Sequence, residues 1–407
     1  METTMPDIIN LIEALDNLSS IDIDVEPDRC VKVRNINAKC SRCAKSCTSE
    51  AIKVSDNKLY VEKSLCIGCG TCATNCPTSA LSAKNPTNAE ILELSIAIAN
   101  THDSSLVFTC SKFIQDNAHS FDTNRVVKVA CLGRLNEAVL ITLLASGINS
   151  IAIVHANCDS CQNTNGKTTM LAVLDNTEKL LCAWNQNLSI SLLTEMPENL
   201  RLSKQIAKKN IDSSGLSRRE FFAQFKTGAK TIASELTASI MTTANTTDAQ
   251  QPPQKVMKDG TLPHFMPQER EVLLNSLSLL GNPTAEQITT RLWGQIEIDI
   301  ETCTTCQMCA TFCPTGAITK FKETDDVTKN EIIGIEHYPA HCLQCRVCED
   351  ICLTNALKVN SAINLKHLIN GTAERFVMRP QTRKINKPDS IYRTMYELLG
   401  GGQIYER

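Results

Sequence analysis

Short apolar runs alternate with helical segments through the middle of the chain. The runs are rich in β-branched residues, which is typical of strands, and they cover residues 106–110, 126–131, 150–154 and 188–193. Apolar residues recur at helical spacing in three further segments, at 88–100, 135–147 and 167–185. A series of this kind predicts a parallel sheet covered by helices, so we expect a central α/β domain over residues 88–199.

The segments outside that domain have weaker patterns. Within residues 1–21, apolar residues at helical spacing predict a packed amphipathic helix; they are Ile8, Leu11, Ile12, Leu15 and Leu18. Residues 200–287 predict a helical or flexible connector, in which the stretch from Thr242 to His264 is rich in Thr, Gln and Pro. Residues 365–407 predict a basic C-terminal tail, a kind of segment that usually packs on its own domain.

Composition and charge exclude several classes of protein. The chain has 407 residues and a formal net charge of −3, and aromatic residues make up 4% of it. Nucleic-acid binding is not indicated, because it requires basic surfaces and aromatic rings for stacking. No run approaches 18 consecutive apolar residues, so we expect no membrane span. The N-terminus carries Glu2 and Asp7 and predicts no secretory leader, and the 21 cysteines then indicate the reducing cytoplasm.

Most of the cysteines fall into four groups. Three groups share the spacing C-x2-C-x2-C-x3-C, and they are Cys66, Cys69, Cys72, Cys76; Cys303, Cys306, Cys309, Cys313; and Cys342, Cys345, Cys348, Cys352. The fourth is Cys30, Cys40, Cys43 and Cys47, which has nine residues between its first two cysteines. An apolar pair, such as Ala80-Leu81, follows each last cysteine at one offset, and we expect it one turn into a helix.

The spacing favours one kind of ligand site over two others. Thiolates are soft ligands that suit iron–sulfur clusters, and three of them within seven residues can reach different corners of one cluster. Zinc sites with four thiolates usually use two separated C-x2-C pairs, so zinc is the weaker alternative. A disulfide framework belongs to small secreted domains and does not suit a chain of 407 residues.

The paired groups at each end resemble the two-cluster bacterial ferredoxins, over residues 22–85 and 288–362. This implies two α+β ferredoxin-like modules, at 22–87 and 288–364, that hold four 4Fe-4S clusters by crossed ligation. The implied ligand sets are Cys30, Cys40, Cys43, Cys76; Cys66, Cys69, Cys72, Cys47; Cys303, Cys306, Cys309, Cys352; and Cys342, Cys345, Cys348, Cys313. The chain departs from the family in the insertion after Cys30, and in Thr48 and Leu353, where proline is usual.

Four more cysteines lie at or just beyond predicted strand ends of the central domain: Cys110, Cys131, Cys158 and Cys161. Ligands of parallel sheets collect at the carboxyl ends of strands. The interpretations are a metal site, a redox dithiol at Cys158 and Cys161, and inert thiols; convergence from separate strands favours the metal site. We expect Cys182, in an apolar helical segment, to be a core residue.

The sequence around these four cysteines resembles the delta subunit of methyl-viologen-reducing hydrogenases. The resemblance covers about residues 100–165 and rests on Phe108-Thr109-Cys110, Cys131-Leu132-Gly133-Arg134 and the Cys158/Cys161 pair. It implies a 2Fe-2S cluster with Cys110, Cys131, Cys158 and Cys161 as ligands. The family commonly has a further cysteine close after the first, where this chain has Ser111, Lys112 and Phe113.

Other catalytic motifs are absent from the sequence. No G-x-G-x-x-G follows a predicted strand, and there is no P-loop. The segment from Leu216 to Phe222 is similar to a twin-arginine export motif, but it is internal. We therefore interpret Ser217 and Glu220 as a helix-capping box.

Together these features predict a cytoplasmic electron-transfer protein with four 4Fe-4S clusters and an additional 2Fe-2S centre. The sequence favours a non-catalytic oxidoreductase subunit over an enzyme, which would need a reactive site at the central cysteines. The resemblances imply a low-potential donor and a redox partner such as formate dehydrogenase, a hydrogenase or a heterodisulfide-type complex. The alternative is an assembly, maturation or redox-sensing factor for a metalloenzyme, in which one cluster is labile.

Overall fold

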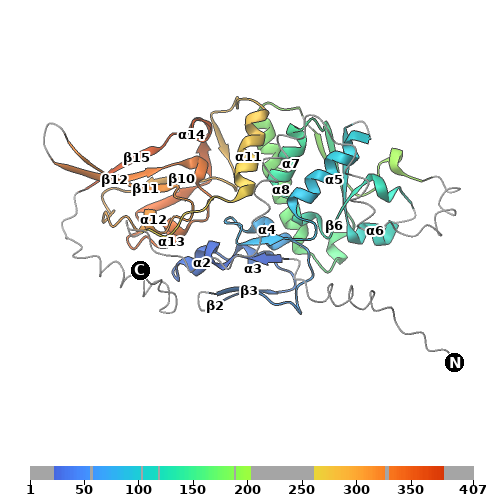
Figure 1. Ribbon diagram of the computed structural model, residues 1–407, viewed down its shortest axis with the longest axis horizontal. Helices are drawn as coiled ribbons and strands as arrows, with labels where there is room; N and C mark the ends of the chain where they lie inside the picture. Colours follow the sequence, from blue (N-terminus) through green and yellow to red (C-terminus); the bar gives the residue numbers. More distant parts are fainter. Residues whose placement is uncertain are drawn as a thin grey trace.

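The computed structural model describes residues 23–55, 58–101, 104–117, 120–187, 189–202, 261–325 and 330–379 (Figure 1). Four predicted features lie wholly or largely outside these residues: the N-terminal amphipathic helix, the twin-arginine-like segment, the stretch from Thr242 to His264 in the connector, and the tail beyond residue 379. Within the described ranges, no helix combines the length and the apolar character needed to cross a membrane.

The central domain contains a sheet in which four strands run parallel. They are β5 (Ser105–Cys110), β6 (Val127–Val129), β7 (Ser150–Val154) and β8 (Ser189–Leu193), in the order β6-β5-β7-β8. The predicted parallel sheet is therefore confirmed. Strands β5 and β7 are almost entirely apolar because the inner strands of such a sheet are covered on both faces. Parallel pairing places the carboxyl ends of β5, β6 and β7 at one edge.

Helices pack around this sheet (Figure 1). They are α5 (Asn88–Thr101), α6 (Ser111–Asn117), α7 (Glu137–Ala145), α8 (Asn165–Ala183) and α11 (Gln268–Leu279). Helix α7 begins at Glu137 because the side chain of Asn136 caps it, accepting a 2.9 Å hydrogen bond from the Val139 amide. Cys182 is exposed, so the prediction of a core position is wrong: Leu180, Leu181 and Ala183 form the buried face of α8 there.

Helix α11 lies within the predicted connector but belongs to the central core. It runs beside α7 in Figure 1, and the hydroxyls of Thr142 and Ser276 share a 2.8 Å hydrogen bond between the two helices. The core continues through α14 (Leu365–Asn370) and through β9 (Gln287–Thr289) and β14 (Ala362–Asn364), which pair antiparallel. Arg291 anchors this segment, because its Nε and Nη2 donate to the buried Glu137 carboxylate at 2.6 and 3.0 Å.

The N-terminal cysteine-rich region is built from short elements. Strand β1 (Ile23–Val25) pairs antiparallel with β4 (Leu81–Ala83), and β2 (Ile52–Ser55) forms a hairpin with β3 (Lys58–Val61). Helix α2 (Val31–Arg34) lies in the insertion after Cys30. Helices α3 (Arg42–Ser46) and α4 (Thr71–Asn75) each follow a cysteine loop.

The C-terminal cysteine-rich region has the same order of strand, helix, hairpin, helix and strand. Strand β10 (Gln295–Ile298) pairs with β13 (Leu357–Asn360), and β11 (Ile318–Thr324) pairs with β12 (Glu331–His337). Helices α12 (Met308–Thr311) and α13 (Val347–Asp350) follow the cysteine loops. Strand β15 (Glu374–Met378), from the predicted tail, pairs with β12 and extends the hairpin to three strands.

The apolar pairs after the last cysteines lead into strands, so the helical prediction for them is wrong. Strands β2, β4, β11 and β13 begin at the second residue of each pair. The residue before each pair has a positive φ: 54° at Glu50, 48° at Ser79, 68° at Gly316 and 54° at Asn355. A left-handed residue cannot continue an α-helix, so the chain turns there and enters a sheet.

The two cysteine-rich regions pack directly against each other (Figure 1). A small apolar cluster joins them, formed by Val31, Ala38, Leu262, Phe312, Val347 and Ile351. Arg42 Nη2 donates to the Gln344 carbonyl at 2.7 Å, across 302 residues of sequence. The Lys39 amide donates to Asp350 Oδ2 at 2.8 Å. Residues from opposite ends of the chain therefore share one interface.

His337 in β12 predicts a pH dependence of stability. The side chain is 0% exposed, and neither ring nitrogen has a partner among the described residues. Burial, and then the charge of His367, lowers the pKa of His337 to about 4. Since the unfolded chain binds this proton near pH 6.5 and the folded chain does not, the free energy of unfolding falls as pH drops from 6.5 to 4, by about 3 kcal/mol.

The variant His337→Leu removes this titration, and its midpoint of thermal unfolding is expected to depend less steeply on pH than that of the unmodified protein between pH 7 and 5. The measurement is a pair of anaerobic thermal scans at each pH. Equal slopes for the two proteins would contradict the prediction.

Candidate metal centres

The eight cysteines of the N-terminal region lie close together, and thiols from its two halves are neighbours. Burial raises the pKa of Cys43 to about 12, and three neighbouring thiols add to the rise: Cys76, Cys30 and Cys40. Burial also raises the pKa of Cys72, with additions from Cys69, Cys43, Cys47 and Cys66. Cys76 and Cys47 thus each lie with the cysteines of the other half.

The C-terminal region repeats this crossing. Burial raises the pKa of Cys303, and the neighbouring thiols of Cys306 and Cys352 add to it. Burial raises the pKa of Cys348 still more, with additions from Cys345, Cys342, Cys313 and Cys309. Cys352 therefore lies near the first group and Cys313 near the second. This is the arrangement that the predicted crossed ligation requires.

Left-handed turns bring three thiols of each compact motif together. The residues directly before and after the second cysteine have positive φ in all three motifs: Gly68 and Gly70, Thr305 and Gln307, and Gln344 and Arg346. Glycine adopts this conformation without strain, whereas the other four residues do so at an energetic cost. Such strain persists only where the surrounding structure holds the loop in place.

A hydroxyl group lies near the last cysteine of each group, and the cysteine spacing alone did not predict it. It belongs to the second residue after that cysteine and lies 3.5–3.9 Å from the sulfur, in the pairs Cys47 and Ser49, Cys76 and Thr78, Cys313 and Thr315, and Cys352 and Thr354. The signal was present, because a serine or threonine stands at this offset in all four groups. Hydroxyl and backbone donors, such as the Ala80 amide 3.2 Å from Cys76 Sγ, stabilise a negatively charged sulfur.

The four thiol sets follow one another without interruption. Cys43 of one N-terminal set is close enough to Cys72 of the other to raise its pKa further, beyond the effect of burial. Cys40 acts in the same way on Cys345 across the interface between the regions, and Cys309 acts on Cys348 within the C-terminal region. The guanidinium of Arg42 is close to both Cys40 and Cys345 at that interface.

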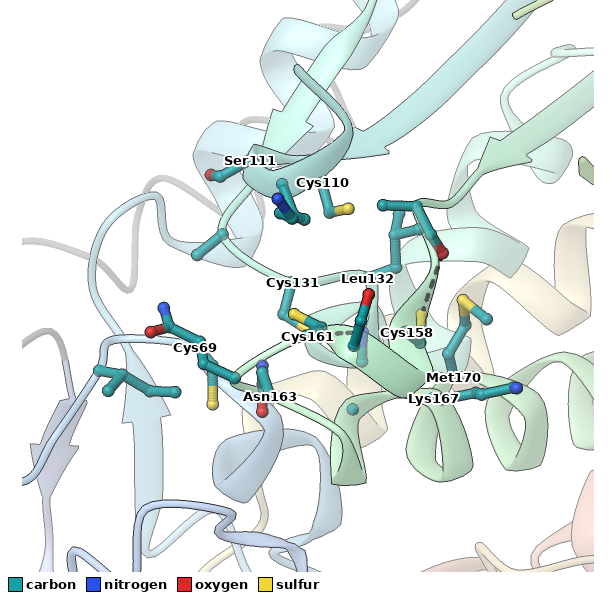
Figure 2. A pocket seen from close by; sticks show the side chains of 18 of the residues that line it. Cys69, Cys110, Ser111, Cys131, Leu132, Cys158, Cys161, Asn163, Lys167 and Met170 are labelled. Carbon is teal, nitrogen blue, oxygen red and sulfur yellow. Dashed lines mark hydrogen bonds between the residues drawn. The ribbon is translucent and has the colours of Figure 1, made fainter. Parts of the chain in front are cut away.

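The central cysteines line a cavity of about 450 Å³ at the carboxyl edge of the parallel sheet (Figure 2). Cys110 ends β5, Cys131 follows β6, and Cys158 and Cys161 follow β7. Burial raises the pKa of Cys131 to about 12, and three thiols add to the rise: Cys69, Cys110 and Cys158. Strand ends bring the four predicted cysteines together, as expected. Cys69 of the N-terminal region also lines the cavity, which the sequence did not indicate.

Two glycines hold Cys131 against helix α8. A Cβ on Gly166 would overlap the sulfur of Cys131, and a Cβ on Gly133 would stand 2.6 Å from the Gly166 carbonyl oxygen. The close approach places Cys131 beside the first turn of α8, where the helix dipole favours a negative charge.

The thiol sets suit iron–sulfur clusters in chemistry and spacing. Among the described residues, no three His, Cys, Asp or Glu side chains converge closely enough to ligate a single metal ion. In a 4Fe-4S cluster each thiolate binds a different iron, and in a 2Fe-2S cluster each iron binds only two thiolates, so no three ligands converge on one ion as they do in a zinc site. Soft thiolates with N–H and O–H donors nearby are the environment that such clusters require.

Comparisons with known families agree with this description. Family models match residues 59–82 as a 4Fe-4S binding domain, residues 108–190 as the delta subunit of methyl-viologen-reducing hydrogenase, and residues 291–356 as a 4Fe-4S dicluster domain. No curated protein and no solved structure matches the chain. Both predicted resemblances are confirmed. The chain thus carries two 4Fe-4S ferredoxin-type domains and, between them, a domain of the hydrogenase delta-subunit type.

Proposed function

We propose that this chain is an iron–sulfur electron-transfer protein in which five metal centres stand in series. Two ferredoxin-like modules flank the central domain, and each holds two 4Fe-4S clusters with the crossed ligand sets described above. Cys110, Cys131, Cys158 and Cys161 hold a 2Fe-2S cluster in the central cavity. When bound, such clusters accept and release single electrons at potentials set by their surroundings.

One observation carries the proposal: every thiol set has a neighbour in the next. The links are Cys131 with Cys69, Cys72 with Cys43, Cys40 with Cys345, and Cys348 with Cys309. An unbroken series serves transport of electrons better than separate reactions would. One electron lost by a donor at one end is gained by an acceptor at the other, and the protein returns to its starting state.

Exposed apolar residues lie near one end of the series, at Cys352, and near the set that contains Cys66, which adjoins the central cavity. Leu353, directly after Cys352, is 88% exposed, and Leu65 and Ile67 on either side of Cys66 are 43% and 39% exposed. Exposed apolar residues beside partly buried cysteines suit transient contact with another redox protein. We propose that a low-potential donor and a catalytic oxidoreductase, such as a hydrogenase, a formate dehydrogenase or a heterodisulfide-type complex, contact the chain in this way.

The test is the content of iron and acid-labile sulfide per chain after anaerobic purification, with EPR spectra of the reduced protein. Four cubane clusters contain about sixteen of each, and a 2Fe-2S centre raises both to about eighteen. We expect the variant Cys76→Ser to disturb the same EPR signal as Cys43→Ser, and not the signal that Cys66→Ser disturbs.

Cys182→Ser is the matched control, because this cysteine is exposed and far from the predicted ligand groups in sequence. It is expected to leave iron content and spectra unchanged. Zinc without sulfide in the purified protein would overturn the proposal, and so would a Cys76→Ser variant with a full set of unchanged signals.

A further inference from the structure

We propose that Asn163 donates a hydrogen bond from its side-chain amide to a sulfur of the centre in the central cavity, and that Thr48 holds it in that orientation. The inference rests on the proposed function in that it requires a metal centre at Cys110, Cys131, Cys158 and Cys161. It adds a residue that sets the potential of this centre and a second residue, in another domain, that positions the first.

The buried amide of Asn163 has an unused donor. The side chain is 6% exposed and lines the central cavity. Its Nδ2 has no hydrogen-bond partner among the described residues. Buried amide groups in folded proteins are nearly always satisfied, so an acceptor for this group is expected in the functional protein.

Thr48 determines which way the amide points. The Thr48 hydroxyl accepts a 3.2 Å hydrogen bond from the Asn165 backbone amide, which leaves its own proton free to donate. It donates that proton to Asn163 Oδ1 at 3.3 Å. The oxygen of Asn163 is therefore bound to Thr48, and the NH₂ group is the end left for the cavity.

The NH₂ group faces the region of the central thiols. Figure 2 shows the nitrogen of Asn163 on the side of Cys131 and Cys161 and its oxygen on the far side. The Cβ position at Gly166, which would overlap the Cys131 sulfur, lies only 3.4 Å from Asn163 Nδ2. Because Gly166 has no side chain, the amide of Asn163 and the sulfur of Cys131 border the same open space.

The chemistry of the acceptor follows from what lines this space. Cluster sulfides and cysteine thiolates are acceptors only, and they become more negative when the centre gains an electron. An N–H donor stabilises the reduced form more than the oxidised form, so it raises the reduction potential. Asn163 is thus placed to raise the potential of the central centre.

Thr48 gains a role from this arrangement. It directly follows Cys47 and stands where two-cluster ferredoxins usually have proline, which has no hydroxyl to donate. In this chain the hydroxyl connects the cysteine loop of the N-terminal region with the central domain. The departure from the ferredoxin pattern therefore supplies the link that orients Asn163.

The experiment is an EPR-monitored redox titration of the full protein, loaded with its clusters. We expect Asn163→Leu to lower the reduction potential of the central centre. At a given applied potential, the ratio of reduced to oxidised centre is expected to fall about tenfold, which corresponds to about 59 mV for one electron. Thr48→Val is expected to shift it in the same direction, and Thr48→Ser to restore it. Asn187→Leu removes an exposed amide next to the amino end of β8, at the edge of the sheet opposite the cavity, and is expected to leave the potential unchanged.

The outcomes separate this inference from the proposed function. A protein with iron and sulfide in the terminal regions but no centre in the cavity would overturn the central part of the proposed function, and this inference with it. A central centre whose potential is equal in the unmodified, Asn163→Leu and Thr48→Val proteins would overturn this inference alone. If Asn163→Leu fails to assemble the centre, Thr48→Val decides: a lower potential supports the inference and an unchanged one refutes it.

Discussion

Replacing Gly166 by valine is expected to abolish the centre in the central cavity while the terminal regions keep their clusters. The reason is steric, because the new Cβ would occupy the position of the Cys131 sulfur. Cys131 cannot retreat, since Gly133 is packed against the Gly166 backbone and leaves no room for a shift. Iron and sulfide are expected to fall by about two atoms each, the content of one 2Fe-2S centre.

The matched control is Thr168→Val, which places the same side chain at an exposed position of the same helix. It is expected to keep all centres, so that a loss in Gly166→Val is not due to a β-branched side chain in this helix. Circular dichroism checks that the central sheet is intact in both variants. A central EPR signal of normal intensity in Gly166→Val would show that Cys131 is not a ligand there.

Removal of the metal is expected to unfold the terminal regions and to leave the central domain folded. The buried apolar clusters inside the two cysteine-rich regions contain only nine and ten residues, and cysteines are among them. The central cluster contains 41 residues. A small core of this kind depends on bound metal, which contributes about 10 kcal/mol or more in structural zinc sites. The clusters are expected to have a similar role here.

Hydrogen exchange of the loaded and the metal-free protein measures this difference by region. Amides in β2, β3, β11 and β12 are expected to exchange at least about 100-fold faster without metal, because local opening then costs little. Amides in β5 and β7 are the internal reference and are expected to keep their protection. Equal protection of the terminal hairpins with and without metal would contradict the prediction.

The interface between the two cysteine-rich regions brings thiols of both regions close to one cation. Arg42 lies there, hydrogen-bonded to the Gln344 carbonyl and close to the thiols of Cys40 and Cys345. A cation beside two thiol sets favours the reduced, more negative state of both. The interface therefore joins the two ferredoxin-type domains both by packing and by charge.

Local features of this protein were readable from the amino-acid sequence. The cysteine spacing is a matter of bond lengths and of a few φ angles, so it indicated the loops without knowledge of the fold, and the resemblance to the two-cluster ferredoxins implied the crossed grouping. The alternation of apolar runs and helical segments predicted the parallel sheet, and parallel strands end at one edge, which brings Cys110, Cys131 and Cys158 together. The helical prediction after each last cysteine failed because the left-handed residue at that turn has no constant identity: it is Glu50, Ser79, Gly316 or Asn355.

Contacts between distant segments depended on the tertiary structure alone. Cys69 lines the central cavity, Thr48 binds Asn163 across 115 residues, and Arg42 reaches Gln344 across 302. No periodicity or spacing encodes such contacts, because they depend on how whole surfaces fit after each domain has formed. Helix α11 joins the central core for the same reason, through packing against α7. The sequence thus determined the cysteine loops and the strands of the central sheet, and the packing of the domains determined which thiols of different regions lie close together.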